Sequence, residues 1–164
     1  MKTNDGVMVG AFDPFTRGHY DLVRRAARLF TTLYLGVADD TGDKRCVCNA
    51  QTRAKIAEIA CRDLPNVRVL PFRGLLTDFC RTVDAYTVVR GLRTFADFEY
   101  EKSLSAVYKS QCDAIESVFL LADPSHAHIS GTFVRSLCKA HGDLTAFVMP
   151  ATLSIIEEYY GQEG

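Results

Sequence analysis

The chain has 164 residues, of which 48% are hydrophobic and 24% are charged, as is usual for a folded globular protein. Its 19 basic and 20 acidic residues give a formal net charge of −1. This balance disfavours a nucleic-acid-binding protein, because such proteins usually carry a basic excess. A small phosphorylated ligand needs only a few local cations and stays compatible with the composition.

The length predicts one domain, residues 1–164, that is large enough to bury a core. The N-terminal residues lead directly into a short apolar run, without a signal-peptide pattern. No run reaches the roughly 18 apolar residues of a membrane span. The six cysteines are scattered and form no C-x-x-C pair, which favours free thiols in a reducing compartment. We therefore expect a cytoplasmic protein that contacts neither membrane nor nucleic acid.

Strand-like and helix-like segments alternate along the chain. The apolar, β-prone segments expected to form strands are Val7–Val9, Thr32–Ala38, Val67–Phe72, Thr87–Val89 and Ser117–Leu121. The segments expected to form helices are His19–Phe30, Asn49–Arg62, Leu75–Val83, Phe95–Cys112, Thr132–His141 and Ala151–Tyr160. This alternation predicts an α/β fold, a single Rossmann-like, doubly wound domain with a parallel sheet. Ligands of such sheets bind outside the carboxyl ends of the strands.

The segment Gly10–His19, GAFDPFTRGH, lies between the first expected strand and the first expected helix. A glycine-bearing turn followed by a helix start brings free N–H groups and the positive helix end together, which predicts an anion site. His19, in the first turn of the helix, could donate a hydrogen bond to a phosphate oxygen. Taken alone, the segment is also compatible with a tight turn, a capping Thr16 and a surface histidine.

Two further segments have the chemistry of phosphate binding. Arg90-Gly91-Leu92-Arg93 follows the fourth expected strand, where the arginine forks suit phosphate and the glycine permits close approach. The segment 126–132, His-Ala-His-Ile-Ser-Gly-Thr, precedes a helix, so its hydroxyl and N–H groups would hold phosphate or cap the helix. A metal site at its two histidines is disfavoured, because no further ligand lies nearby in the sequence.

These three segments, in this order, resemble those of the nucleotidylyltransferase superfamily. They resemble most closely the bacterial phosphopantetheine adenylyltransferase family, with its G-T-F-D-P-x-T-x-G-H, R-G-L-R and I-S-S-[ST] motifs. The resemblance runs from Val9 to about Phe147. It implies a fold of the nucleotidylyltransferase type and transfer of AMP from ATP to 4′-phosphopantetheine. The products would be dephospho-coenzyme A and pyrophosphate, in coenzyme A biosynthesis. It also implies Mg²⁺ carried by the ATP phosphates, and a homo-oligomer, commonly a hexamer.

The resemblance also implies which residues form the site. The expected catalytic residues are His19, Lys44 and Arg93. The expected ATP-binding residues are Ala11, Phe12, His19, Gly91, Leu92, Arg93, Glu101, His126, Ala127, His128, Ile129, Ser130, Gly131 and Thr132. The expected acceptor-binding residues are Ala11, Lys44, Leu76 and Arg90. Lys44 has a neighbouring rival in Arg45, because the loop is one residue longer than in the family.

Three residues depart from the family pattern: Ala11 replaces a threonine that contacts the acceptor phosphate, Arg17 replaces an asparagine, and Gly131 replaces a serine. The loss of the hydroxyl at Ala11 leaves open a catalytically weak nucleotide-binding relative. Another small nucleotidyltransferase, a cytidylyltransferase or a nicotinamide mononucleotide adenylyltransferase, is the second alternative. Those enzymes usually carry histidine where this chain has Thr16.

Overall fold

The computed structural model describes residues 4–39, 42 and 45–162, which include five strands in one sheet. The strands are β1 (Asp5–Gly10), β2 (Thr32–Ala38), β3 (Val67–Phe72), β4 (Thr87–Leu92) and β5 (Glu116–Leu121). All neighbouring strands are parallel, in the order β3-β2-β1-β4-β5, which confirms the predicted sheet. Strand β4 runs to Leu92, three residues beyond its apolar pattern, because Arg90 and Gly91 still pair with Phe119 and Leu120.

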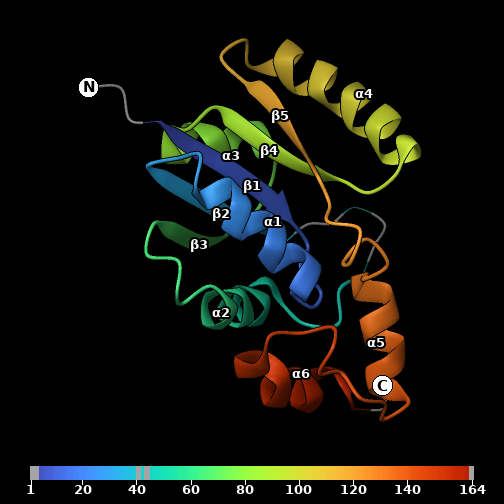
Figure 1. The fold of residues 1–164 in the computed structure, drawn as a ribbon. Helices are drawn as coiled ribbons and strands as arrows, with labels where there is room; N and C mark the ends of the chain where they lie inside the picture. The colour runs from blue at the N-terminus through green and yellow to red at the C-terminus, as the bar shows by residue number, and fades with distance from the viewer. Residues whose placement is uncertain (1–3, 40–41, 43–44, 163–164) are drawn as a thin grey trace.

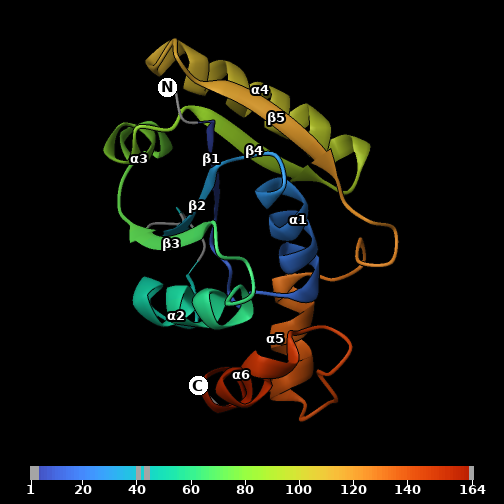
Figure 2. The same cartoon turned by 60° about the vertical axis from the view of Figure 1, so that its left-hand side comes forward.

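Helices cover both faces of this sheet, as Figures 1 and 2 show. In chain order the helices are α1 (Arg17–Ala27), α2 (Ala50–Ala60), α3 (Leu76–Val83), α4 (Phe95–Gln111), α5 (Gly131–Lys139) and α6 (Leu153–Tyr160), the last preceded by a 3₁₀ turn, η1 (Pro150–Thr152). Met8 of β1 packs in the core beneath α1 and α2, whereas its neighbour Val7 packs in the core beneath α3. This alternation of side chains is what a strand buried on both faces requires, and it confirms the doubly wound architecture.

The strand order places a topological switch point between β1 and β4. From β1 the chain builds β2 and β3 on one side, and it then crosses to build β4 and β5 on the other. The connections that leave β1 and β4 therefore lead to opposite faces, which opens a crevice at their carboxyl ends. Helices α5 and α6 pack together beyond this end of the sheet (Figure 1).

The cysteines form no disulfide with one another in the described residues, and Cys48, Cys61, Cys80 and Cys138 are buried. Burial raises the pKa of Cys61 to about 12 and that of Cys80 to about 11, so these thiols stay protonated. They therefore act as small apolar side chains of the core. Within the described ranges, no helix has the length and apolar character needed to cross a membrane.

Candidate active site

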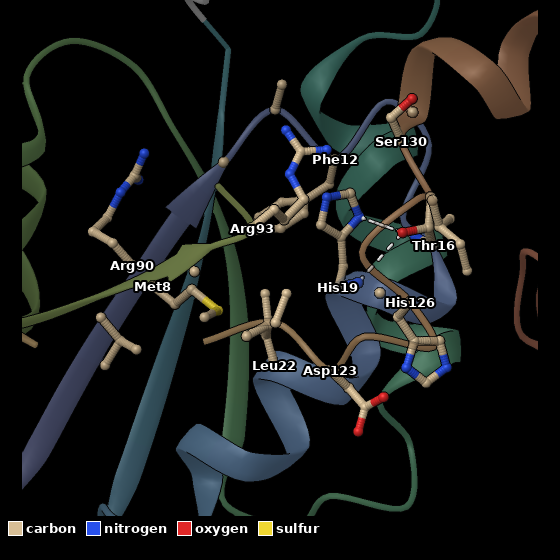
Figure 3. Close-up of a pocket in the computed structure, with 18 of the residues that line it drawn as sticks. Met8, Phe12, Thr16, His19, Leu22, Arg90, Arg93, Asp123, His126 and Ser130 are labelled. Atoms are coloured by element: carbon tan, nitrogen blue, oxygen red, sulfur yellow. Dashed lines mark hydrogen bonds between the residues drawn. The ribbon is translucent and has the colours of Figure 1, made fainter. Parts of the chain in front are cut away.

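A pocket of about 420 Å³ opens at the carboxyl ends of β1 and β4, in the crevice of the switch point (Figure 3). Its volume lies within the usual range of small-molecule sites. The predicted site residues that line it are Ala11, Phe12, His19, Arg90, Gly91, Arg93, His126, Ile129, Ser130 and Gly131. The fold therefore brings residues from all three sequence motifs to one cavity.

His19 and Thr16 form a reciprocal cap at the start of α1. The Thr16 hydroxyl oxygen accepts from the His19 N–H at 3.3 Å, and His19 Nδ1 accepts from the Thr16 N–H at 3.0 Å. Histidine here takes the place that Glu or Gln holds in a capping box. Because Nδ1 is an acceptor, the neutral ring carries its proton on Nε2, which lies on the Arg93 side of the ring (Figure 3).

His19 is held in its neutral form. Its ring packs against those of Phe12 and Phe15, with centroid distances of 5.1 Å and 5.5 Å. Burial, and secondarily the positive charge of Arg93, lower the pKa of His19 to about 4. At neutral pH the ring is therefore an uncharged hydrogen-bond donor fixed at the pocket wall.

Arg93 supplies the positive charge beside His19 (Figure 3). Its backbone N–H and that of Thr94 both donate to the carboxylate of Asp97, at 2.9 Å and 3.2 Å, which fixes the turn between β4 and α4. The Arg93 Nε lies 3.6 Å from the same carboxylate, so an ion pair with Asp97 also orients the Arg93 side chain. The guanidinium remains half exposed and can meet an anion in the pocket.

The N-terminus of α5 forms the wall opposite β4. Ser130 is its N-cap, and the Ser130 hydroxyl oxygen accepts from the Phe133 N–H at 3.1 Å. A Cβ atom at Gly131 would lie 2.9 Å from the Asp13 carbonyl oxygen, so a larger residue would push α5 away from the turn after β1. The glycine that departs from the family serine thus permits the close approach of α5 in this chain.

Arg90 lies in the pocket lining, but its side chain is directed away from the cluster of His19 and Arg93 (Figure 3). Its Nε and Nη2 donate to the two carboxylate oxygens of Glu101 on α4, at 2.7 Å and 2.8 Å. Its Nη1 donates to the Val9 carbonyl oxygen at 3.0 Å. This bidentate pair is largely buried and fixes the guanidinium in one orientation.

The remaining predicted residues that the structure describes do not line the pocket. Glu101 forms an ion pair with Arg90, and its contact with ATP stays a prediction, whereas Leu76 is buried in the core beneath α3. Leu92, Ala127, His128 and Thr132 adjoin lining residues in the chain without lining the pocket themselves. Lys44 falls outside the described residues. Its rival Arg45 is exposed.

Two residues at or near the site, Asp123 and Arg53, belong to no sequence motif that predicted them. Asp123 follows β5 and lines the pocket, and in the sequence only its position just after a strand indicates a place near the site. Arg53 is 1% exposed on α2, among the small apolar residues of the helix. Its Nε donates to the Cys48 carbonyl oxygen at 2.8 Å, and its Nη1 donates to those of Ala38, at 3.0 Å, and Ala11. The helical spacing places Arg53 toward the core, but it does not reveal what an arginine would bind there.

The comparisons with known proteins agree with this geometry. Residues 7–137 match the family model described as cytidylyltransferase-like. The phosphopantetheine adenylyltransferase of Burkholderia vietnamiensis is 43% identical over 145 residues, which are 88% of this chain and 87% of that protein. The phosphopantetheine adenylyltransferase of Azoarcus sp. is 41% identical over 156 residues, 94% of this chain and 95% of that one.

The fold also has a solved counterpart. A crystal structure assigned as a nicotinate-nucleotide adenylyltransferase of Vibrio parahaemolyticus superposes with a TM-score of 0.73 at 15% identity. The match covers 98% of this chain and 97% of that one, and it supports the fold alone. From the family model and the relatives together, the chain belongs to the cytidylyltransferase-like family and, within it, to the phosphopantetheine adenylyltransferases.

The lowered pKa of His19 predicts a pH dependence of stability. An unfolded histidine has a pKa near its usual value of about 6.5, whereas the folded one titrates at about 4. As the pH falls from 6.5 towards 4, His19 binds a proton in the unfolded state but stays neutral in the folded state. The free energy of unfolding therefore decreases. We expect the unfolding free energy of the wild type to fall by about 1–3 kcal/mol more than that of His19→Gln over this range.

Chemical denaturation at pH 7.0, 5.5 and 4.5 would measure this difference. Glutamine is a suitable replacement because it can also close a capping box but does not titrate. Parallel pH profiles for the two proteins would show that His19 has an ordinary pKa in the folded state.

Proposed function

We propose that this protein transfers AMP from ATP to 4′-phosphopantetheine, and produces dephospho-coenzyme A and pyrophosphate. One observation carries the proposal. In a chain of the phosphopantetheine adenylyltransferase family, a neutral donor, a cation and a helix N-terminus converge on the pocket at the switch point. These are His19, Arg93 and the Ser130–Gly131 end of α5, and each of them suits a phosphate group.

The ATP triphosphate occupies this pocket in the proposal. His19 Nε2 donates to a phosphate oxygen, and Arg93 neutralises charge beside it. The N–H groups at the start of α5 hold the terminal phosphates, with Ser130 as the cap that orients them. His126 and Ile129 line the same wall and flank the nucleotide.

The acceptor occupies the other side of the strand tips. Arg90 and Leu76 lie toward α3 and α4, whereas His19 and Arg93 lie toward α1 and α5. We assign Arg90 to the acceptor, with Lys44 as a second cation from the loop after β2. Glu101 is assigned to the nucleotide, and both of its carboxylate oxygens also orient the guanidinium of Arg90. Ala11, at the end of β1, lies between the two sides and contacts both substrates.

The reaction then needs no covalent enzyme intermediate. An oxygen of the acceptor phosphate attacks the α-phosphorus of ATP from the side opposite the β-phosphate. A new bond forms between this oxygen and the α-phosphorus. The bond between the α-phosphorus and the oxygen that bridges it to the β-phosphorus breaks, and pyrophosphate leaves. The protein contributes alignment of two polyanions and fixed donors that stabilise the charge developing in the transition state.

Magnesium is assigned to the ATP phosphates, whose oxygens are ligands that the ion prefers. The donor set of the pocket fits an ion that arrives with the nucleotide. Among the described lining residues the acidic side chain is Asp123, and this carboxylate already accepts hydrogen bonds from the N–H and hydroxyl of Ser125.

We also propose a cytoplasmic homo-oligomer, and specifically a hexamer. The free thiols support the compartment. Large apolar side chains on the outer surface support association, since Phe95 on α4 is 78% exposed and Leu121 on β5 is 71% exposed.

Substrate choice tests the proposed function. With Mg²⁺, the purified protein should release pyrophosphate from ATP with 4′-phosphopantetheine. It should release much less when CTP replaces ATP, or when nicotinamide mononucleotide replaces phosphopantetheine. Equal or faster turnover with either replacement would overturn the assignment, and no turnover with any pair would favour a nucleotide-binding relative.

The two arginines should act on different substrates. Arg90→Ala should weaken phosphopantetheine binding at least tenfold and leave ATP binding close to normal, because one charge-assisted contact is worth about 1.5–3 kcal/mol. Arg93→Ala should instead damage the ATP-dependent step. Isothermal titration calorimetry with each substrate, together with kcat, would separate the two effects.

Lys109→Ala provides the control, since Lys109 is an exposed cation on α4 paired with Glu116. It should bind both substrates as the wild type does. If the Arg90 and Arg93 variants also bind both substrates normally, neither arginine contributes to substrate binding and the assignment of both is wrong.

A further inference from the structure

The C-terminal helix reaches into the turn after β1 through one side chain. Tyr160, at the end of α6, is 1% exposed, and its hydroxyl donates to Asp13 Oδ1 at 2.6 Å. Asp13 lies in the middle of the GAFDPFTRGH motif and is itself 6% exposed. A hydroxyl-to-carboxylate bond of this length is charge-assisted and strong.

Asp13 forms contacts with three other parts of the chain: the segment before α2, helix α5 and helix α6. Its Oδ2 accepts from the Val47 N–H at 3.0 Å, in the segment before α2. Its carbonyl oxygen accepts from Nη1 of Arg135 on α5, and the same Nη1 lies 3.7 Å from Oδ2. Tyr160 therefore completes a set of contacts that holds both the side chain and the backbone of Asp13.

The turn is held at Ala11 as well, two residues earlier, where Arg53 binds the carbonyl oxygen. Phe12, between these two anchors, has a φ of 50°, a left-handed conformation that is uncommon for a bulky residue. The ring of Phe12 meets the ring of His19 edge to face. A change at Asp13 would therefore reach the histidine that lines the pocket.

The Tyr160 hydroxyl keeps its proton in this setting. Burial, and then the Asp13 carboxylate, raise the pKa of Tyr160 far above its usual range. Tyr160 is therefore a hydrogen-bond donor to Asp13 at neutral pH.

We propose that Tyr160 is a positioning residue for nucleotidyl transfer, which fixes through Asp13 the turn that presents Phe12 and His19 to the pocket. It lies outside the three sequence motifs and outside the pocket lining. The kinetic part of this inference rests on the proposed function. The part that concerns the geometry of the turn does not.

The test compares Tyr160→Phe with Tyr159→Phe. The first variant removes only the buried hydroxyl, and the second removes a hydroxyl from the neighbouring residue, which is exposed. We expect Tyr160→Phe to lower kcat for pyrophosphate release about tenfold, the scale of one lost hydrogen bond, with KM for ATP changed less than kcat. Tyr159→Phe should match the wild type.

Hydrogen exchange provides a second readout that does not depend on the reaction. In Tyr160→Phe the amides of residues 11–13, 15 and 16 should exchange faster than in the wild type, and in Tyr159→Phe they should not. A thermal unfolding curve for each variant reports whether the fold itself has weakened.

Faster exchange of the turn together with a lower kcat supports the proposal. A lower unfolding temperature with wild-type kcat and wild-type exchange overturns it, because Tyr160 would then be structural only. If the wild type releases no pyrophosphate with phosphopantetheine, the proposed function fails. In that case the hydrogen-exchange rates of the turn amides still test whether Tyr160 fixes the turn.

Discussion

The site depends on how the turn between β1 and α1 is held. Arg53 carries a buried charge whose Nε and Nη1 donate to carbonyl oxygens, those of Ala11, Ala38 and Cys48. Such bonds offset the cost of burying the guanidinium, and they join the ends of β1 and β2 to the start of α2. The unusual backbone of Phe12 persists because the turn is anchored on both sides, at Ala11 and Asp13.

The two sides of the strand tips differ in their electrostatic character. Toward α1 and α5 lie a neutral histidine, a half-exposed arginine and a helix N-terminus, all able to accept a flexible polyphosphate. Toward α4 lies an arginine already held by Glu101 at both of its oxygens. The half-exposed Arg93 can adjust to a phosphate chain, whereas His19 and Arg90 are each held in one orientation. A protein with a net charge near zero can therefore bind two anions through local charge alone.

The sequence predicts the fold and the pocket wall because both depend on local signals. Apolar periodicity indicates the strands and helices, and the motifs mark His19, Arg93 and Ser130 at strand ends or helix starts. The contacts of Arg53, Asp13 and Tyr160 could not be predicted, because each joins segments far apart in the chain and only the fold brings them together. The same reason applies to the pairing of Glu101 with Arg90, which joins α4 to β4. Gly131 departs from the family pattern, and the nearby Asp13 carbonyl explains why a small residue suits that position.

We infer that the turn after β1 presents a neutral donor, His19 Nε2, to the phosphates that undergo transfer. The most direct test is the kcat of His19→Ala compared with its ATP affinity. We expect kcat to fall roughly 10²-fold, the effect of removing one preorganised donor, with a far smaller change in ATP binding. His19→Gln, which keeps a neutral N–H donor, should recover part of the rate. Near-normal turnover in His19→Ala would contradict this role and leave His19 as a helix cap.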